Sequence, residues 1–467
     1  MAVRFTAPEY RADGSFGIAA YALEGSAGQG WTVWREGRRH VELGPGYRRL
    51  DTVSCGICAT DLARRHLPFP LPQVIGHEVL ALDEAGARHV VEINASCAAR
   101  GLEPGCPFCR AGLSNHCPDR RVLGIHDLPG GFGPHVLAPV NAVLAVPDAI
   151  PDAAAVLVEP LAAALHAVMT VAPRAGDRVA VLGPRRLGLL GVAALRAYRR
   201  RHDLDVEIVA LARREALLDR ATEFGADTGY RVEGAGAELP DGFADVVIDT
   251  SGNPDALTLA LRLARREVHV KSTHGRPSAG IDHLTELVVD ELGIGGFRPA
   301  DVAGRTVAWL AEDPPPAGLA VARMLRGEPA ALLEALESGA AAAGGLARAD
   351  VAVVDSAAGI DRAIRPRADR EVSLVRPRGR ILVRLRPGAA ADSPLVRAVA
   401  ERGLALTTSR CGDFRAALEL MAADPELVRV SERLITHRFP PDRLQEAFAM
   451  AASPECIKAV VEQEARP

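Results

Sequence analysis

The part of the chain that begins near Val158 alternates helical patterns with short apolar runs. The helical pattern VEPLAAALHAVMTV is followed by the turn APRAGD and the apolar run RVAVLG. The amphipathic stretch GPRRLGLLGVAALRAYRR then precedes the run VEIVALA, and another run, ADVVIDTSG, begins at Ala244. Strands that alternate with helices are typical of a parallel, doubly wound sheet covered by helices. The sequence therefore predicts an α/β fold for this part of the chain.

Residues 1–160 carry a different pattern. They are rich in Gly and Pro and contain short apolar runs, such as 88–93 and 142–146, with few long helical periods. That pattern predicts a largely β domain whose loops carry functional residues. Because 467 residues are too many for one compact core, we expect at least two domains.

Parts of the second half of the sequence resemble one another. The stretch ADVAVVDSAAGIDRAI, from Ala349, resembles ADVVIDTSGNPDALTLAL, from Ala244. In the same order, GRILVRLRPG resembles REVHVKSTHG, and ERGLALTTSR resembles DELGIGGFR. These likenesses indicate either a degenerate duplication of a strand–helix–strand–strand unit or the general similarity of any two βαβ units.

A connector of Ala-rich helical stretches, with the proline break DPPPAG, separates the two similar segments over about 299–348. The predicted domain organisation follows from these patterns. We expect a first domain over 1–160, a second over 161–298, an inserted or duplicated unit over 299–410, and a return to the first domain over 411–467.

Charge and hydropathy argue against several classes of function. A formal net charge of −4 gives no electrostatic footprint for nucleic acid or an anionic membrane. No run reaches the ~18–20 apolar residues of a membrane span, and the start MAVRFTAPEYRADG has no apolar signal segment, so we expect a cytoplasmic protein. Lys271 and Lys458 are the only lysines. Lysine chemistry is therefore not expected unless Lys271 carries it.

Six of the eight cysteines lie between positions 55 and 117, in two clusters. Without a secretory signal, metal binding is favoured over a disulfide framework. In CGICATDL, Cys58 follows a predicted strand, and nineteen residues later IGHEVL places His77 beside Glu78. Glu159 stands at the start of the helix in VEPLAAA. A thiolate, an imidazole and carboxylates suit Zn²⁺, which acts as a Lewis acid when one position stays open.

The motifs C-G-I-C-A-T-D, G-H-E and V-E-P-L-A, in this order, resemble the zinc-binding signatures of the medium-chain dehydrogenase/reductase superfamily. Its polyol, threonine and glucose dehydrogenases are the most similar branches. The resemblance implies a GroES-like, β-rich catalytic domain and a Rossmann nucleotide-binding domain. It also implies a catalytic zinc with Cys58 and His77 as ligands, while Glu78 and Glu159 share or exchange one position. Thr60 matches the hydroxyl that passes the alcohol proton outward.

The family pattern also bears on a neighbouring cysteine and on a relay histidine that this chain lacks. Cys55 is implied to be a bystander to the ligand Cys58. A second relay histidine often follows the ligand cysteine by five residues, and this position is Ala63 here. The proton exit is therefore left open between His66, water and the cofactor ribose.

The second cysteine cluster comprises Cys97, Cys106, Cys109 and Cys117. The C-x2-C-x7-C spacing of the last three resembles the structural-zinc lobe of the same family. Four thiolates close a tetrahedral zinc site with no open position, so such a zinc braces a loop and performs no chemistry. Eight residues separate the first two cysteines, whereas the family has two. Either Cys97 closes the site on a bulged loop, or it is an ordinary buried cysteine and the zinc site has lapsed.

The segment VAVLGPRRLGLLGVAAL stands where the family has its dinucleotide fingerprint. Backbone N–H groups at a helix N-terminus, approached through glycines, hold a pyrophosphate in such a turn. Arg185 replaces the middle glycine, so it either supplies charge to the phosphates or impairs binding by its bulk. The residues predicted to form this part of the cofactor site are Gly183, Arg185, Arg186, Leu187 and Gly188.

The run VEIVALARR should end at the residue that reads the adenosine ribose. The position of the acid that selects NAD is Ala212, and Arg213 and Arg214 follow it. Adjacent arginines suit a 2′-phosphate, so we predict a preference for NADP over NAD. The alternative is that these arginines are solvated residues at a helix start. Thr250, Ser251 and Gly252 are expected on the nicotinamide side.

The leading hypothesis is a zinc-dependent oxidoreductase that transfers a hydride between an alcohol, polyol or sugar hydroxyl, or the corresponding carbonyl, and NAD(P). A zinc-stabilised scaffold without turnover is the alternative, motivated by Arg185 and Ala63. A third reading is a zinc enzyme that does not use nicotinamide conventionally. The expected partners are a small-molecule alcohol or sugar and, as a homodimer or homotetramer, further copies of the chain. The family pairs subunits through the last strand of the nucleotide domain, for which ELGIGGF and GLALTTS are both candidates.

Overall fold

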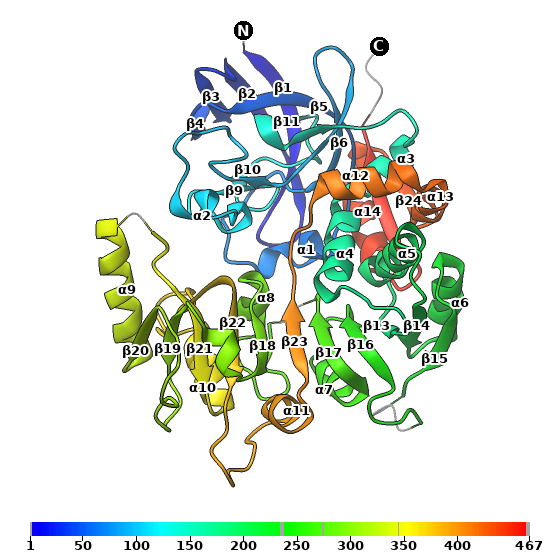
Figure 1. The fold of residues 1–467 in the computed structure, drawn as a ribbon. Coiled ribbons are helices and arrows are strands. Elements are labelled where there is room, and N and C mark those ends of the chain that lie inside the picture. The colour runs from blue at the N-terminus through cyan, green and yellow to red at the C-terminus, as the bar shows by residue number, and fades with distance from the viewer. Residues whose placement is uncertain (1, 234–237, 273–274, 344, 464–467) are drawn as a thin grey trace. The chain divides into compact units, whose positions relative to one another are not determined.

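The computed structural model describes residues 2–233, 238–272, 275–343 and 345–463. Contacts between residues divide the chain into two compact units. Unit 1 combines residues 1–162 with residues 411–467, and unit 2 comprises residues 163–410. In Figure 1 the blue strands and the red C-terminal elements belong to unit 1, and the yellow elements belong to unit 2. None of the helices within the described ranges is long and apolar enough to cross a membrane.

Unit 1 is built mainly on antiparallel strands, as predicted for a β-rich domain. One sheet is a four-stranded meander of β1 (Val3–Tyr10), β2 (Phe16–Ser26), β3 (Gly30–Arg35) and β4 (Arg38–Leu43). The largest sheet has the order β12–β7–β6–β5–β25–β24, with β11 also paired to β5. Its strands are β5 (Tyr47–Gly56), β6 (Glu78–Leu82), β7 (Arg88–Val91), β11 (His135–Pro139), β12 (Val143–Ala145), β24 (Ile435–Phe439) and β25 (Lys458–Glu462). A small sheet contains β8 (Asn94–Ala95), β9 (Arg121–Leu123) and β10 (Asp127–Leu128).

The C-terminal segment completes the largest sheet of unit 1. After the helices α12 (Phe414–Ala423), α13 (Pro425–Glu432) and α14 (Leu444–Ala452), the strand β25 pairs antiparallel with β5. Val460 lies opposite Gly56 in this pairing. On α14, Phe448 packs edge to face against Phe132, with ring centroids 5.6 Å apart. The start of β25 therefore lies beside the end of β5, where the predicted metal motif begins.

Unit 2 contains a single large sheet, and six of its strands run parallel in the order β15–β14–β13–β16–β17–β23. Numbered along the chain, this order is the 3-2-1-4-5-6 arrangement of a Rossmann domain. Strands such as β13 and β16 are almost entirely buried, which is typical of a parallel sheet covered on both faces. The strands are β13 (Arg178–Leu182), β14 (Glu207–Ala212), β15 (Thr228–Arg231), β16 (Ala244–Asp249), β17 (Ala264–Val270) and β23 (Ala405–Thr408). The predicted α/β fold is confirmed.

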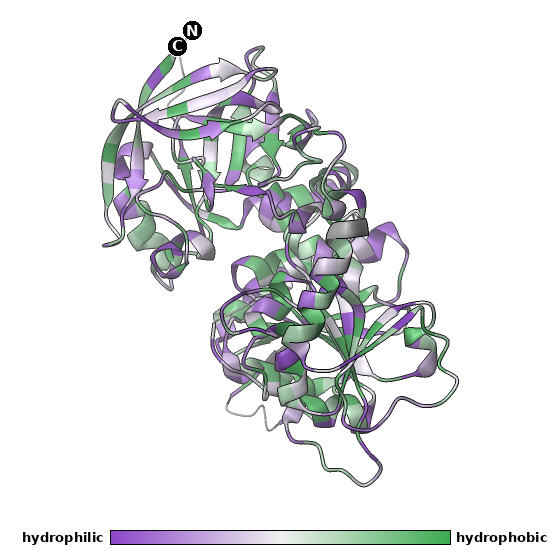
Figure 2. Ribbon diagram, turned by 90° about the vertical axis from the view of Figure 1, so that its left-hand side faces the viewer, coloured by the Kyte–Doolittle hydropathy of each residue, from purple (hydrophilic) through white to green (hydrophobic). Residues whose placement is uncertain are grey.

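Helices pack against this part of the sheet. Contacts join α5 (Arg186–Arg201) to β13 and β14, α6 (Glu215–Phe224) to β14 and β15, and α7 (Pro254–Leu263) to β16 and β17. The helix that precedes β13 is α4 (Val158–Val171). Hydrophobic residues, green in Figure 2, occur along strands and helices of both units.

The same sheet continues beyond β23 with five more strands, in the order β18–β22–β21–β19–β20. The pair β18 and β23 is antiparallel, and the other pairs in this part are parallel. The strands are β18 (Gly293–Gly296), β19 (Thr306–Trp309), β20 (Arg323–Arg326), β21 (Ala349–Val354) and β22 (Val375–Val383). The helices in this part of the chain are α8 (Leu284–Val289), α9 (Pro329–Ala343), α10 (Ala357–Ile364) and α11 (Pro394–Arg402).

The prediction of a helical connector over 299–348 is wrong for most of that segment. It contains the strands β19 and β20, and of its Ala-rich stretches only α9 is a helix of more than one turn in the described part. Trp309 is 2% exposed and Val307 is fully buried. A short apolar run buried on both faces has no alternation, so its sequence does not distinguish a strand from a buried helix.

A buried carboxylate forms the turn that ends β16. Asp249 accepts hydrogen bonds at Oδ1 from the backbone N of Ser251, at 2.9 Å, and from its Oγ, at 2.7 Å. Burial disfavours the charged carboxylate and raises the pKa of Asp249 to about 6, although the bonds from Ser251 act in the opposite direction. The turn places Thr250 and Ser251 at the carboxyl end of the sheet.

Replacing Asp249 with Asn is predicted to stabilise the protein above neutral pH. The unfolded chain loses the Asp249 proton near pH 3.8, whereas the folded chain keeps it to about 6, so ionisation costs stability as the pH rises through that window. Asn keeps an oxygen acceptor for Ser251 without a charge. Unfolding by urea should show a gain on the order of 1–3 kcal/mol at pH 7.5 that shrinks towards pH 4.5. A loss of stability at pH 7.5, in place of the predicted gain, would contradict this account.

Candidate functional site

Cys58 is held by a short helix that begins directly after it. The helix α1 (Ala59–Leu62) follows β5 by three residues, and Cys58 is its N-cap. The backbone N of Cys58 donates to Asp61 Oδ2 at 2.8 Å. An acid three residues after the cap commonly satisfies this N–H. Asp61 is 1% exposed, so the buried carboxylate fixes the backbone that carries the Cys58 thiol.

The other oxygen of the same carboxylate faces the predicted histidine ligand. Asp61 Oδ1 lies 3.3 Å from Nδ1 of His77, whose side chain is also buried. Burial favours the neutral ring, but the charges of Asp61 and Cys58 outweigh it and raise the pKa of His77 above its ordinary value. A carboxylate behind a histidine fixes the ring orientation and leaves the second nitrogen to a metal. Asp61 therefore connects the two predicted ligands.

Lys458, the first residue of β25, enters the site from the C-terminal segment. Its Nζ lies against Oε2 of Glu78 and donates to the carbonyl of Ile57 at 3.1 Å. Among the described residues, Oε1 of Glu78 has no hydrogen-bond partner, although the atom is buried. Burial disfavours the ammonium, but the charges of Glu78, Cys58 and Glu159 raise the pKa of Lys458 above its ordinary value.

Space for this ion pair depends on a glycine. A Cβ on Gly56 would lie 2.0 Å from Oε2 of Glu78 and 3.0 Å from Cε of Lys458. A side chain at this position would therefore displace the Glu78 carboxylate from its place beside Lys458. The expectation that only Lys271 could carry lysine chemistry missed Lys458, because nothing near it in the sequence points to Glu78.

Of the remaining predicted catalytic residues, Thr60 lies near Cys58 and Glu159 acts on the charge of Lys458. Thr60 Oγ1 is 3.8 Å from Cys58 Sγ. Glu159 is the second residue of α4, and its charge acts on Lys458 together with those of Cys58 and Glu78. Thr60 is partly buried, whereas His66, one of the possible proton exits, is exposed and contacts Arg65.

The second cysteine cluster converges on one point. The four Sγ atoms of Cys97, Cys106, Cys109 and Cys117 all lie within 4.8 Å of one another. Cys117 Sγ is 3.6 Å from the Sγ atoms of both Cys97 and Cys106. Sulfur atoms bound about 2.3 Å from a tetrahedral zinc lie roughly 3.8 Å apart, so these distances fit that ion. Among the described residues, this is the one group of three or more candidate ligands that meets in this way.

The long spacing before Cys106 folds into a compact loop. The backbone N of Leu102 donates to the carbonyl of Cys97 at 3.0 Å, and the N of Arg100 donates to that of Ser96 at 3.0 Å. Cys106 caps the helix α2 (Pro107–Arg110) by accepting from the N of Cys109 at 3.5 Å. The eight residues are therefore folded back, and Cys97 stands with the other three cysteines.

The turn after β13 is closely packed where glycines were predicted. Gly183 has a φ of +81°, and a Cβ there would lie 2.8 Å from Cα of Ser251. A Cβ on Gly188 would lie 2.5 Å from Oγ1 of Thr250, which donates to the carbonyls of Leu182 and Gly183 at 3.0 Å each. Both glycines let the turn pack onto the end of β16.

The helix α5 begins immediately after Arg185, its N-cap, and no side chain caps its first turn. The first N–H groups of a helix have no intrahelical acceptors and form an anion site. Arg186, Leu187 and Gly188 stand in this first turn, at the carboxyl end of the Rossmann-ordered strands. At the end of β14, Arg213 and Arg214 are both exposed, and Arg214 is the N-cap of α6.

Lys271 takes part in a buried polar network at the ends of β17 and β23. Its Nζ donates to Ser409 Oγ at 3.1 Å and to the carbonyl of Arg410. Ser409 Oγ is also 2.9 Å from Nε2 of His269. Burial, followed by the charge of Lys271, lowers the pKa of His269 well below its ordinary value. The sequence drew attention to Lys271 but carried no signal for its partners, Ser409 and Arg410, which follow the distant strand β23.

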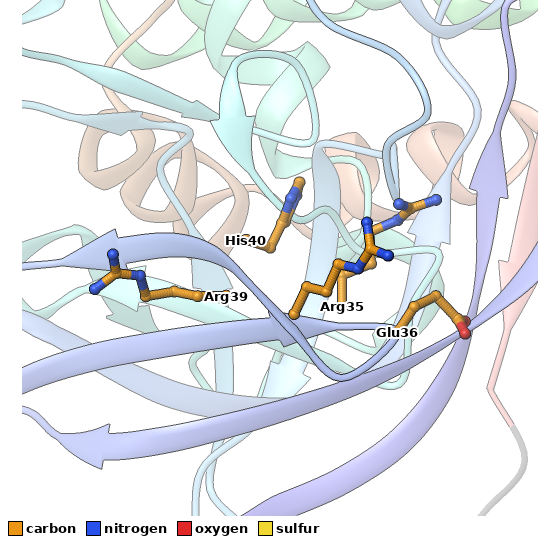
Figure 3. A pocket seen from close by; sticks show the side chains of 5 residues that line it. Arg35, Glu36, Arg39 and His40 are labelled. Atoms are coloured by element: carbon orange, nitrogen blue, oxygen red, sulfur yellow. The ribbon is translucent and has the colours of Figure 1, made fainter.

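A polar surface hollow lies away from these residues, on the β3–β4 hairpin of unit 1. Figure 3 shows that the labelled side chains of Arg35, Glu36, Arg39 and His40 border it. Arg35 is held by Glu9, to whose Oε2 it donates at 2.8 Å. None of the predicted catalytic, metal or cofactor residues lines this hollow.

Replacing Lys458 with Met is predicted to destabilise unit 1 strongly. The change leaves the buried Glu78 carboxylate without its counter-ion, and breaking a buried pair in this way costs about 3–5 kcal/mol. Urea unfolding measures the loss. The double variant Lys458→Met with Glu78→Gln removes both charges and should recover much of it. Equal losses in the single and double variants would show that the charge pair is not the cause.

Comparison with known proteins agrees with this geometry. Residues 44–148 match the family model of the alcohol dehydrogenase GroES-like domain. L-galactonate-5-dehydrogenase of Escherichia coli K12 is 30% identical over 249 residues, which are 50% of this chain and 70% of that protein. Sorbitol dehydrogenase of Halalkalibacterium halodurans is 29% identical over 237 residues, which are 47% of this chain and 66% of that protein.

A solved structure shows the same fold. An alcohol dehydrogenase from Escherichia coli CFT073, complexed with NADH, is 17% identical and has a TM-score of 0.57. The alignment covers 98% of this chain and 99% of that chain. The predicted GroES-like and Rossmann architecture is confirmed by the family match and by this likeness. The chain therefore belongs to the zinc-dependent medium-chain dehydrogenase/reductase superfamily and is an oxidoreductase of that type.

Proposed function

We propose that the protein catalyses zinc- and NAD(P)-dependent oxidation of an alcohol, polyol or sugar hydroxyl, or the reverse reduction. The observation that carries this proposal is the arrangement of Cys58 and His77 around the buried Asp61 carboxylate. The curated relatives named above are dehydrogenases of sorbitol and L-galactonate. Their names support a small polyhydroxy substrate, while the particular alcohol is set by loops outside these motifs.

We assign a catalytic zinc to the residues around Cys58 on the chemistry of their donor atoms, since among the described residues only the four cysteines form a group of three or more ligand atoms that all lie within 4.8 Å of one another. Cys58 supplies a thiolate, His77 supplies an oriented imidazole, and Glu159 or Glu78 supplies a carboxylate. The buried Oε1 of Glu78 lacks a hydrogen-bond partner among the described residues, as expected of an atom that meets a cation. Lys458 already holds Oε2 of Glu78. We therefore assign Glu159 as the carboxylate that would bind the zinc at rest, and Glu78 as one that would replace it for part of the reaction.

The protein's own groups position the substrate hydroxyl. A bound zinc would supply a Lewis acid for the substrate oxygen, and a bound nicotinamide would supply the hydride acceptor. Thr60 Oγ1, 3.8 Å from Cys58 Sγ, takes the hydroxyl proton and passes it outward. Asp61 faces Nδ1 of the His77 ring at 3.3 Å, and Lys458 holds the Glu78 carboxylate at one oxygen.

A second zinc is assigned to Cys97, Cys106, Cys109 and Cys117. The convergence of all four sulfurs favours the alternative in which Cys97 closes the site on its folded loop. Four thiolates leave no position for substrate, so this zinc would stabilise the loop alone.

The nucleotide is assigned to the turn between β13 and α5. Gly183 and Gly188 pack the turn onto the end of β16, the N-terminus of α5 offers its first N–H groups to a pyrophosphate, and Arg185 adds positive charge at its cap. Exposed Arg213 and Arg214 at the end of β14 support NADP over NAD. Thr250, Ser251 and Gly252 follow β16 at the same edge of the sheet and face the nicotinamide half.

Two further expectations stay proposals. A cytoplasmic location is consistent with the lack of a membrane-crossing helix in the described ranges. In the expected homodimer or homotetramer, either β18 or β23 was to form the contact between subunits. These two strands pair with each other inside the chain. The strand edge that such an assembly would use is therefore already paired within the chain. A scaffold without turnover is the competing function, because Arg185 stands where the family has glycine.

Metal analysis and nucleotide titration test the proposal. The purified protein should contain two zinc ions per chain, and Cys58→Ser and Cys97→Ser should each remove one of them. Only Cys58→Ser should abolish alcohol oxidation, because the other zinc is remote from the chemistry. NADPH should bind saturably and more tightly than NADH. If the protein contains zinc at the Cys58 site but binds neither NADPH nor NADH, the dehydrogenase proposal is wrong and the scaffold function is favoured.

A further inference from the structure

The sheet of unit 2 contains the same strand arrangement twice. In the first half, five strands lie in the order β14–β13–β16–β17–β23. In the second half the order is β20–β19–β21–β22–β18. The first four strands of both halves follow the chain in the same order, and the fifth positions are taken by β23 and β18. Among the described residues of the second half, no strand corresponds to β15. The repeat is therefore longer than the sequence indicated, since it begins at β19 rather than at β21.

A polar hydrogen-bonded arrangement recurs at matching positions of both halves. It consists of the first residue of one strand, an aspartate that is the second residue of the neighbouring strand in the sheet, and an arginine that is the second residue of the strand beyond. In both halves the backbone N of the first strand donates to the aspartate Oδ2 at 2.9 Å. The arginine donates to Oδ1 of the same aspartate, at 2.9 Å in one half and 2.7 Å in the other. The residues are Arg178, Asp245 and Arg265 in the first half, and Thr306, Asp350 and Arg376 in the second.

The strand register is repeated as well. The strand β17 pairs with β23 so that Val268 lies opposite Leu406. The strand β22 pairs with β18 so that Ile381 lies opposite Ile294. In both β16 and β21 the pairing with the next strand is irregular between the first and third residues. General similarity of βαβ units does not predict shared irregularities, so a duplication explains them better.

The last strands of the two halves are exchanged. Along the chain, β18 follows β17 but pairs with β22, whereas β23 follows β22 but pairs with β17. The two exchanged strands meet antiparallel, with Ile294 opposite Leu406. These residues occupy the same position in their respective halves. A residue that faces its own counterpart is the property of a twofold contact between two copies of one surface.

We infer that the second half of this sheet takes the place of a second subunit. The pairing of β18 with β23 is a twofold sheet contact made within one chain, and it closes the edge that a second copy would otherwise use. The protein is therefore a monomer with one complete nucleotide fold and one structural half.

The remaining edges of the sheet support a closed monomer. The outer strands, β15 and β20, have four residues each. Exposed arginines stand on both of them, at Arg231, Arg323 and Arg326. Short, charged edge strands resist pairing with another chain.

The second half also lacks the element that binds a pyrophosphate. In the first half α5 connects β13 to β14 and presents its N-terminus. In the described residues between β19 and β20, no helix stands in the corresponding place. Provided that the proposed nucleotide site is correct, the chain binds one dinucleotide rather than two.

Cross-linking the seam distinguishes a contact within one chain from an exchange between chains. Directly opposed residues of antiparallel strands have Cβ atoms about 4.5–5.5 Å apart, close enough for a disulfide after a small shift. The double variant Ile294→Cys with Leu406→Cys, oxidised under mild conditions, should form an intrachain disulfide and migrate as a monomer on a non-reducing gel. Each single variant and the unaltered chain, treated identically, are the controls. Covalent dimers, or folded protein without the cross-link, would overturn the inference.

The mass of the unaltered protein tests the same inference without mutation. Sedimentation at micromolar concentration should give one species of 49.3 kDa. A stable species of twice this mass would contradict it. Calorimetric titration with NADPH should give one site per chain, and two sites would show that the second half binds nucleotide. Absence of any nucleotide binding would count against the proposed function, while the mass and the cross-link would still decide the monomer.

Discussion

The buried ion pair between Glu78 and Lys458 joins the beginning of the chain to its end. Glu78 starts β6 and Lys458 starts β25, so the pair forms only when the C-terminal strand has docked beside β5. Gly56 leaves the space in which the two charged groups meet. Two charges removed from water are costly unless each remains with its partner. The predicted catalytic residues therefore depend on the return of residues 411–467 to unit 1.

The two candidate metal sites illustrate two uses of the same ion. Around the four cysteines, the sulfurs converge on one point, and the loop before Cys106 is folded to allow it. Around Cys58, the ligand set is mixed and one carboxylate is engaged by a lysine. A closed thiolate cage stabilises structure, whereas a mixed site with a movable carboxylate leaves room for a substrate oxygen.

The motifs that carry local chemistry could be predicted from the sequence, whereas contacts between distant segments could not. Cys58 and His77 stand in short motifs, and the glycines of the turn after β13 were found by position. Lys458 was missed because its partner Glu78 lies near the other end of the chain. The helical expectation for the connector failed at β19, whose continuous apolar run has no period. The exchange of β18 and β23 changes no sequence pattern, since both orders of pairing use the same strands.

Diffraction at the zinc absorption edge, from crystals grown with NADP, tests the central claim most directly. The account predicts two anomalous peaks per chain, one among the four cysteine sulfurs and one bounded by Cys58, His77 and a carboxylate. It also predicts a single nucleotide, with its pyrophosphate at the turn between β13 and α5. A metal confined to the four cysteines, with the space beside Cys58 and His77 free of zinc, would contradict the assignment of this chain as a zinc-dependent dehydrogenase.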